Sequence, residues 1–329
     1  MRLRILSAAD LRRALPMVQA VEAMKDAYRQ LSLGQAVVPL RSRLPVDEAG
    51  GVTLIMPALV SSSREMAVKL VSVFPGNRQR GLPTIHAAVV VFDPTSGQPI
   101  ALIEGSSLTA LRTGAGTGAA TDVLARPQAA TVALIGSGVQ ARTQLEAVCA
   151  VRPIQRALVF SRQPDHARTF AAELAGSPGF PAQIEVAETP EAAVRPADII
   201  CAATTSTTPV FPGQSLTPGA HVNAVGSYTA DMQEVDLATL QRARVYVDSL
   251  PSALEEAGDL LVPISRGAWR AESIIGEIGQ VLAGDIEGRT SDQDITYFKS
   301  VGVAVQDAVA ASRALAAAEA ADLGQVVEL

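Results

Sequence analysis

Apolar and polar positions change their spacing within the first third of the chain. Over residues 7–34 the apolar positions recur at helical spacing, which predicts one short helix after Ser7 and a second over 17–33, ending at Gly34. Further along, β-rich runs alternate with proline and glycine clusters, a pattern that predicts a mostly antiparallel sheet. These runs are 52–56, 65–73, 85–93 and 100–104.

The second part of the chain alternates short apolar runs with helical segments. This alternation is typical of a doubly wound parallel sheet, so the fold class we expect is α/β with a Rossmann-type domain. A helix over 108–125 precedes it, and an alanine-rich helix over 303–323 is expected to return to the first domain. The predicted domains are therefore 1–125 with 303–329 returning, and 126–302. The strand candidates of the second domain are 131–135, 156–160, 184–187, 199–203, 221–225 and 245–247.

The sequence TVALIGSGVQA at 131–141 places a glycine-rich turn directly after a buried strand. Gly136 permits the tight turn, Gly138 lets backbone approach a pyrophosphate, and Ala141 keeps the next helix close to the strand. A helix over 142–150 and a strand over 156–160 complete a βαβ unit. This context favours a dinucleotide site over a glycine turn that serves packing alone.

The end of the second strand of this unit indicates which dinucleotide binds. Ser161 and Arg162 stand where an NAD site usually has an acidic residue for the ribose 2′-hydroxyl. An arginine can instead hold a 2′-phosphate, so NADP(H) is preferred and NAD(H) is possible. The alternative is that Arg162 is an ordinary solvated loop residue.

Composition excludes several other classes of function. A net charge of −6 and a pI near 5.2 argue against a nucleic-acid or anionic-membrane surface. Cys149 and Cys201 lie in apolar runs and are predicted to be core residues, while the three histidines lack metal-ligand spacing, so no metal is expected. Without an apolar leader or an 18-residue apolar run, we expect a cytoplasmic protein.

Three cations precede the glycine turn and are candidates for binding an anion. Lys69 lies inside an apolar β-run, where an unpaired ammonium is costly to bury, so an anion should neutralise it. The alternative is that Lys69 reaches solvent or pairs with a protein carboxylate. Arg112, before a run of small residues, suits a substrate carboxylate, and Arg41 is the third cation.

Several motifs together resemble the ornithine cyclodeaminase and mu-crystallin family. They are LIMPAL at 54–59, AVKLVSVFPGN at 67–77, the block at 81–121, GSGVQA, NAVGSYTADMQEVD at 223–236 and YFKSVGVAVQD at 297–307. The resemblance implies a homodimer of two-domain chains, each with a Rossmann domain and a discontinuous α/β dimerisation and substrate domain. It also implies a small amino acid or cyclic imino acid as substrate and NAD(P)(H) as cofactor.

The resemblance assigns roles to individual positions. Arg41, Lys69 and Arg112 match positions that hold the substrate carboxylate, with Tyr228 and Val301 also on the substrate side and Lys69 and Arg112 as the catalytic candidates. For Thr204 and Ser300, ordinary loop or helix-cap hydroxyls are the alternative. The cofactor-side positions are Thr84, Thr113, Gly136, Ser137, Gly138, Val139, Gln140, Ser161, Arg162, Thr204, Val225, Gly226 and Ser300, and Val301 borders the nicotinamide side.

Two departures from the family pattern indicate the branch. Leu54 replaces the glutamate of the ornithine cyclodeaminases, and Tyr228 replaces an aspartate that they share with the alanine dehydrogenases. Asp231 is nearby, but we expect it to cap a helix that starts near Met232. Without those carboxylates, the sequence predicts an NADPH-dependent reductase of small cyclic ketimines, in which Lys69 delivers or organises a proton. The alternatives are an amino-acid dehydrogenase, an ornithine cyclodeaminase and a non-catalytic NADPH-binding protein.

Overall fold

A computed structural model describes residues 1–328 of the 329-residue chain. Two compact units divide it, the first formed by Met1–Arg112 with the chain from Val303 onward, and the second by Thr113–Gly302. No helix among the described residues is both long enough and apolar enough to cross a membrane.

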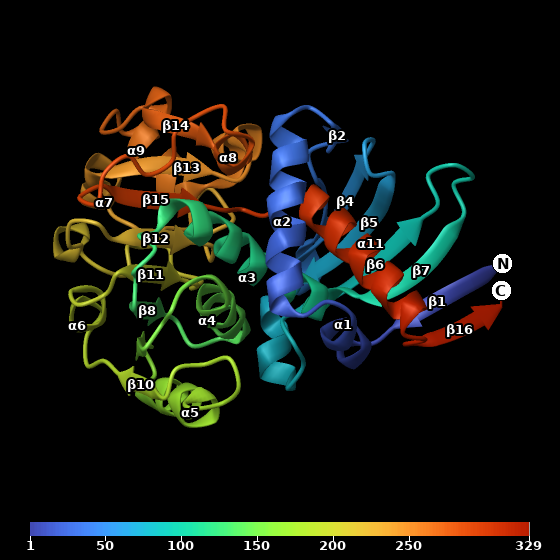
Figure 1. The fold of residues 1–329 in the computed structure, drawn as a ribbon, viewed down its shortest axis with the longest axis horizontal. Helices are drawn as coiled ribbons and strands as arrows, with labels where there is room; N and C mark the ends of the chain where they lie inside the picture. The colour runs from blue at the N-terminus through green and yellow to red at the C-terminus, as the bar shows by residue number, and fades with distance from the viewer. Residues whose placement is uncertain (329) are drawn as a thin grey trace. The chain divides into compact units, whose positions relative to one another are not determined.

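One eight-stranded sheet organises the first unit (Figure 1). Its order is β16-β1-β7-β6-β5-β4-β2, with β3 also paired to β4. All its pairs are antiparallel except β1 with β7, which confirms the expected mostly antiparallel sheet. The strands are β1 (Arg2–Leu6), β2 (Ala36–Val37), β3 (Ser42–Val46), β4 (Gly51–Val60), β5 (Glu65–Val73), β6 (Ile85–Phe92), β7 (Pro99–Glu104) and β16 (Gln325–Glu328).

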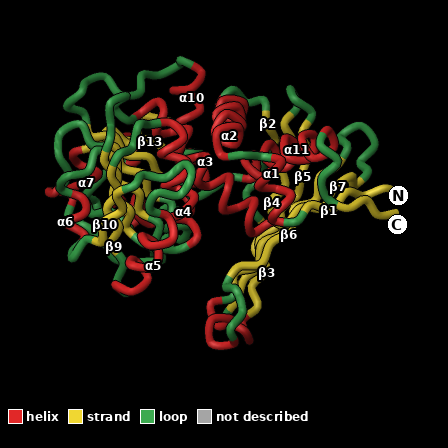
Figure 2. The backbone as a smooth tube through the Cα atoms, turned by 60° about the horizontal axis from the view of Figure 1, so that its bottom comes forward, coloured by secondary structure: helices red, strands yellow, loops and turns green. Residues whose placement is uncertain are grey.

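Helices cover one face of this sheet. Helix α11 packs on β4, β5 and α2, and the side chains of β4 and β5 that point toward it are buried. On the opposite face, Ile55 and Leu70 are direct cross-strand partners and remain exposed. The ends of β3 to β6 and two short turns extend from the helices as an arm (Figure 2). The helical segments are α1 (Ala8–Ala14), α2 (Met17–Ser32), η1 (Asp47–Ala49), η2 (Pro75–Arg80), α3 (Gly105–Leu124) and α11 (Ala304–Ala320).

The second unit is a doubly wound sheet of eight parallel strands, as expected. Its order is β10-β9-β8-β11-β12-β15-β13-β14, so the chain runs outward from β8 and then reverses across β11. The strands are β8 (Thr131–Ile135), β9 (Arg156–Phe160), β10 (Gln183–Val186), β11 (Ile199–Ala202), β12 (His221–Ala224), β13 (Ala243–Val247), β14 (Ile274–Glu277) and β15 (Ile295–Lys299). The helical segments are α4 (Val139–Val151), α5 (Pro164–Leu174), α6 (Pro190–Val194), η3 (Gly213–Ser215), α7 (Leu237–Arg242), α8 (Leu250–Glu256), α9 (Gly258–Ser265), η4 (Ala271–Ser273) and α10 (Ile278–Ala283).

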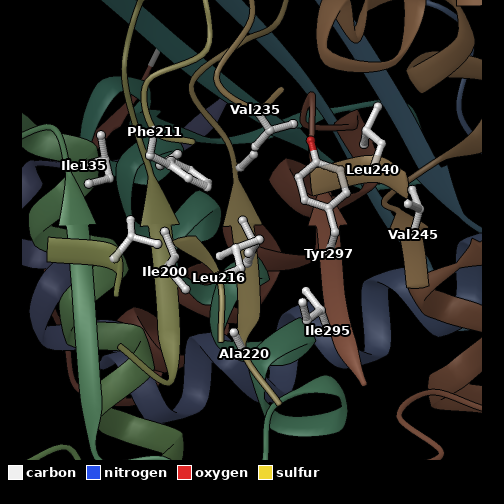
Figure 3. Close-up of a cluster of buried hydrophobic side chains, with 14 of the residues drawn as sticks. Ile135, Ile200, Phe211, Leu216, Ala220, Val235, Leu240, Val245, Ile295 and Tyr297 are labelled. Atoms are coloured by element: carbon white, nitrogen blue, oxygen red, sulfur yellow. The ribbon is translucent and has the colours of Figure 1, made fainter. Parts of the chain in front are cut away.

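Both faces of this sheet are buried, which is why its strands read as continuous apolar runs. Along β8, Val132 and Leu134 enter one core cluster, whereas Ala133 and Ile135 enter the other. Figure 3 shows the second cluster, where Ile135 and the aromatic ring of Tyr297 belong to the same layer. Because all eight strands are parallel, their carboxyl ends lie along one edge of the sheet.

Two expectations need correction. The predicted boundary at 125/126 lies instead at 112/113, because the second half of α3 packs on the second unit, where Thr117 donates a hydrogen bond to Gln144. The helix expected near Met232 does not form. Asp231 accepts a hydrogen bond from Thr229, and the next helix, α7, is capped by Asp236.

Candidate functional site

A buried carboxylate joins two of the predicted cations in the first unit. Lys69 lies on β5 with 1% of its side chain exposed, and its Nζ lies 2.7 Å from Oδ2 of Asp307. Arg112, on α3, places its Nε 3.1 Å from Oδ1 of the same residue. Asp307 belongs to the first turn of α11, whose packing against β5 brings the three groups together.

A second layer of hydrogen bonds fixes the guanidinium of Arg112. Its Nη1 donates to Oε1 of Gln306 at 3.0 Å, and Nε2 of Gln306 donates to the Tyr28 hydroxyl at 2.8 Å. Gln306 and Tyr28 are fully buried. The arginine is therefore held in one orientation before any ligand arrives.

The electrostatics of this cluster favour an added anion. Burial and, next, the charge of Arg112 lower the pKa of Lys69 to about 7, and Asp307 only partly opposes these effects. Arg41, before β3, makes a smaller contribution of the same sign as Arg112, so the three predicted cations act on one region. A small carboxylate would supply the missing negative charge.

Sequence reasoning missed Asp307. The sequence predicted that an anion neutralises Lys69. In the structure this anion is a carboxylate of the protein itself, which was the alternative interpretation. The available signal was an aspartate within the apolar run VGVAVQDAVAA at 301–311, where a buried acid requires a cation. The same carboxylate also binds Arg112, so it aligns both cations rather than neutralising one.

In the second unit, the glycine turn after β8 has the geometry of an anion site. Gly136 has φ +106°, and a Cβ there would lie 2.7 Å from the carbonyl oxygen of Ala203. Gly138 is the N-cap of α4 with no side-chain cap hydrogen bond, and a Cβ there would meet no atom within 4 Å. The N-terminal N–H groups of α4 are thus left for a ligand, and these residues fit a pyrophosphate.

Helix α3 reaches this turn through its small residues. A Cβ on Gly114 would overlap the carbonyl of Thr143 on α4, so only glycine allows this approach. Nε2 of Gln144 donates to the carbonyl of Thr113 at 3.4 Å. The structure therefore brings Thr113 to α4, the helix that begins with Val139 and Gln140.

The other cofactor-side residues follow the strands of the same sheet. Because parallel strands end at one edge, the structure brings together residues that are far apart in sequence. Ser161 and Arg162 follow β9 and Arg162 is exposed, while the backbone N–H of Gln163 lies 3.4 Å from the Ser161 hydroxyl. The remaining ones are Thr204 after β11, Val225 and Gly226 after β12, and Ser300 after β15, and the substrate-side candidates Tyr228 and Val301 follow the same two strands, β12 and β15. Thr84 differs, because it lies in the arm of the first unit, where its carbonyl accepts from the Phe74 N–H, outside the cation cluster.

The hydroxyl of Ser300 has a structural partner. It donates to Oδ2 of Asp248 at 2.7 Å, and the same oxygen accepts the N–H groups of Val301 and Gly302 at 2.9 and 2.7 Å. Sequence reasoning missed Asp248, which follows directly after β13. The carboxylate sets the backbone path of the segment after β15.

The chain is similar to known proteins over nearly its whole length. A family model described as the ornithine cyclodeaminase/mu-crystallin family matches residues 2–320. A delta(1)-pyrroline-2-carboxylate reductase of Bacillus cereus is 41% identical over 308 residues, which cover 93% of this chain and 94% of that protein.

Two solved structures share the whole fold. The delta(1)-pyrroline-2-carboxylate reductase of Thermococcus litoralis, in complex with NADH and L-proline, has a TM-score of 0.94 and 39% identity, covering 98% of this chain and 99% of its own. An archaeal alanine dehydrogenase dimer with bound NAD has a TM-score of 0.92 and 32% identity, covering 100% of both chains. The match of the family model across both units, together with these relatives, shows that this chain belongs to the ornithine cyclodeaminase/mu-crystallin family.

Proposed function

We propose that this protein is an NAD(P)H-dependent reductase of small cyclic imino acids such as Δ1-pyrroline-2-carboxylate. The observation that carries the proposal is the buried pair Lys69 and Arg112, aligned on Asp307, in a chain that also has an uncapped dinucleotide turn at Gly138. The 41% identical relative bears the name of this activity.

Different residues of the chain have different roles in such a reaction. A bound NAD(P)H would supply the hydride that the imine carbon accepts. Arg112 binds the substrate carboxylate through its planar guanidinium, and Lys69 adds a second charge. With a pKa of about 7, Lys69 also holds a proton that it can release toward the imine nitrogen near neutral pH.

The residues at two positions argue against the diamino-acid branch of the family. Leu54 is 5% exposed on β4, and Tyr228 is half-buried after β12, so neither position offers a carboxylate. A diamino acid would carry a second ammonium without an evident partner at these positions. Reduction of an imine needs no such partner.

Steady-state kinetics tests this function. Purified protein should oxidise NADPH with Δ1-pyrroline-2-carboxylate or Δ1-piperideine-2-carboxylate in the absence of ammonia. A strict requirement for ammonia with 2-oxo acids would indicate an amino-acid dehydrogenase instead, and ornithine consumption without net NADPH oxidation would indicate a cyclodeaminase. Binding of NADPH without any turnover would indicate a carrier.

Substitutions in the cation cluster test the assigned site. Arg112→Ala and Lys69→Ala should each lower kcat/KM about 100-fold or more while NADPH affinity changes only a few-fold, because each removes a desolvated charge contact. Arg112→Lys should not restore activity, since a point charge cannot replace the planar guanidinium. A folded Arg112→Ala protein with unchanged kcat/KM would place the active site elsewhere.

The preference for NADPH over NADH is a finer part of the proposal. Its support is Arg162, exposed after β9, at a strand end that carries Ser161 and no carboxylate. Ser161→Asp combined with Arg162→Ala should reverse the preference, with about 1–3 kcal/mol of discrimination. The comparison is the Kd of each coenzyme in both proteins, and equal wild-type affinities for NADPH and NADH would contradict it.

A further inference from the structure

Three charged side chains are completely buried together in the second unit. Glu234, Asp259 and Lys299 each have an exposed fraction of 0%. Nζ of Lys299 lies 2.9 Å from Oδ2 of Asp259, and Asp259 accepts the backbone N–H of Glu234 through Oδ1 at 2.6 Å. Burying such a set is costly unless each group is paired, and here Lys299 and Asp259 pair with each other.

Both carboxylate oxygens of Glu234 accept hydrogen bonds from backbone N–H groups at the edge of the sheet. Oε1 accepts the N–H of Thr204 at 2.6 Å, and Oε2 accepts those of Gly226 and Ser227 at 2.7 and 3.2 Å. These donors follow β11 and β12, two adjacent parallel strands. One carboxylate thus joins the two strand ends that carry Thr204 and Gly226.

Lys299 and Asp259 hold the same segment from its other side. Lys299, the last residue of β15, donates to the carbonyl and hydroxyl of Ser227 at 2.7 and 2.6 Å. The Ser227 hydroxyl in turn donates to Oδ2 of Asp259 at 2.7 Å. Burial acts to raise the pKa of Asp259, but Lys299 and Ser227 hold that pKa below its usual value.

The fit of this segment leaves little freedom. A Cβ on Gly226 would overlap the backbone of Thr204 and the carboxylate of Glu234. The Thr204 segment also borders the glycine turn, since a Cβ on Gly136 would lie 3.4 Å from Cγ2 of Thr204. The charged set therefore lies directly behind backbone that adjoins the dinucleotide turn.

Ser161 and Arg162 after β9 suit the adenosine end of a dinucleotide, so its nicotinamide end falls on the other side of β8, at β11 and β12. We propose that Glu234, supported by Asp259 and Lys299, is a positioning residue that fixes the segments Thr204 and Gly226–Ser227 against the nicotinamide end of the coenzyme. It acts through these backbone groups and does not itself touch the reacting atoms. This inference rests on the proposed function only in taking the coenzyme to be NAD(P)H.

Glu234→Gln tests the proposal, because it keeps the size of the side chain but turns an NH₂ group toward backbone N–H donors. We expect kcat to fall about 10- to 100-fold, as for a displacement of reacting groups by about 1 Å, while KM for the imino acid stays within about 3-fold. With coenzyme deuterated at the transferred position, the isotope effect on kcat should rise, because hydride transfer becomes slower than the other steps. Emission of bound NADPH should also change, since the environment of its nicotinamide changes.

Asp198→Asn is the matched control. Asp198 also accepts two backbone N–H groups, those of Ala130 and Thr131 at 2.9 and 3.0 Å, but at the amino ends of the strands. It should lower the Tm and leave kcat, the isotope effect and NADPH emission unchanged. If Glu234→Gln does not fold, Ser227→Ala retains every charge and should show the same changes, about 3- to 10-fold in kcat.

The outcomes separate this inference from the proposed function. Wild-type kcat, isotope effect and NADPH emission in folded Glu234→Gln and Ser227→Ala proteins would overturn it. A wild-type protein that binds NADPH but reduces no ketimine would contradict the proposed function alone, and the emission of bound NADPH would still decide the role of Glu234.

Discussion

Glycine occupies two positions of the turn after β8 for different physical reasons. Gly136 has a positive φ and faces the carbonyl of Ala203, so the fold itself excludes a Cβ there. Gly138 has φ −79°, which suits any residue, and open space around its Cα. Glycine at 136 is therefore explained by the turn, whereas glycine at 138 suits the proposed approach of a pyrophosphate to the backbone.

Alanine at each position should separate the two roles. Gly136→Ala should lower the free energy of unfolding by about 1–3 kcal/mol, because it forces a strained backbone and a close contact. Gly138→Ala should cost about 1 kcal/mol or less in stability but weaken NADPH binding about tenfold or more. Thermal unfolding and fluorescence titration on both variants check this, and normal NADPH affinity in Gly138→Ala would refute a phosphate contact at this residue.

The pKa of Lys69 predicts how the activity depends on pH. Because its pKa is about 7, the fraction that carries a proton falls as the pH rises through 7. If that proton reaches the imine, kcat/KM for reduction should decline about tenfold per pH unit above this value. Lys69→Arg keeps its charge at all these pH values. Its activity should be lower and should not show this decline with pH, except for the part that titration of the imine causes in both proteins. Identical profiles for the two proteins would remove Lys69 as the proton source.

Single residues also show what sequence can predict about a site. An apolar run around Lys69 indicated that an anion must be near, because the cost of burying a charge is local. Its partner Asp307 could not be identified, since the pairing depends on α11 packing against β5. The same holds for Glu234 and Asp248, whose hydrogen bonds to distant backbone exist only in the folded sheet.

At the scale of elements, strong local periodicity was enough for the four longest helices and for most of the central strands. The βαβ unit around Gly136 and the antiparallel runs were predicted, because turn residues and apolar runs mark them directly. Strands β1, β2, β3, β14, β15 and β16 were missed. Strand β15 mixes polar Thr296 and Lys299 with its apolar residues, and both are buried only through specific partners. The strands β1 and β16 depend on pairing with each other and with β7.

The packing of α3 on α4 gives the prediction at this scale. Gly114→Ala improves intrinsic helix propensity by up to about 1 kcal/mol, yet its Cβ would overlap the carbonyl of Thr143. Overpacking of this kind typically costs about 1–3 kcal/mol, so we expect net destabilisation and weaker NADPH binding through the shifted start of α4. A higher Tm in Gly114→Ala would show that α3 and α4 can move apart without a loss of stability.

At the scale of the whole molecule, one face of the first unit's sheet carries exposed apolar side chains. We propose a homodimer, supported by exposed apolar side chains on strands that helices cover on only one face. Ile55 and Leu70 pair directly across β4 and β5 and are 38% and 41% exposed. Covering a contiguous apolar surface of this kind is favourable, and exposed strand edges add a reason to associate.

Leu70→Glu tests this assembly. An ionised carboxylate enclosed in an apolar interface costs roughly 2 kcal/mol or more for each copy, so the substituted chain should be a monomer at micromolar concentration. Light scattering should give twice the 34.2 kDa of one chain for the wild type and 34.2 kDa for the variant. Val18→Glu, at a residue of α2 that is 61% exposed, is the control and should remain a dimer. A wild-type mass of one chain would refute the dimer, and a dimeric Leu70→Glu protein would place the interface on another surface, because the charge would then remain in solvent.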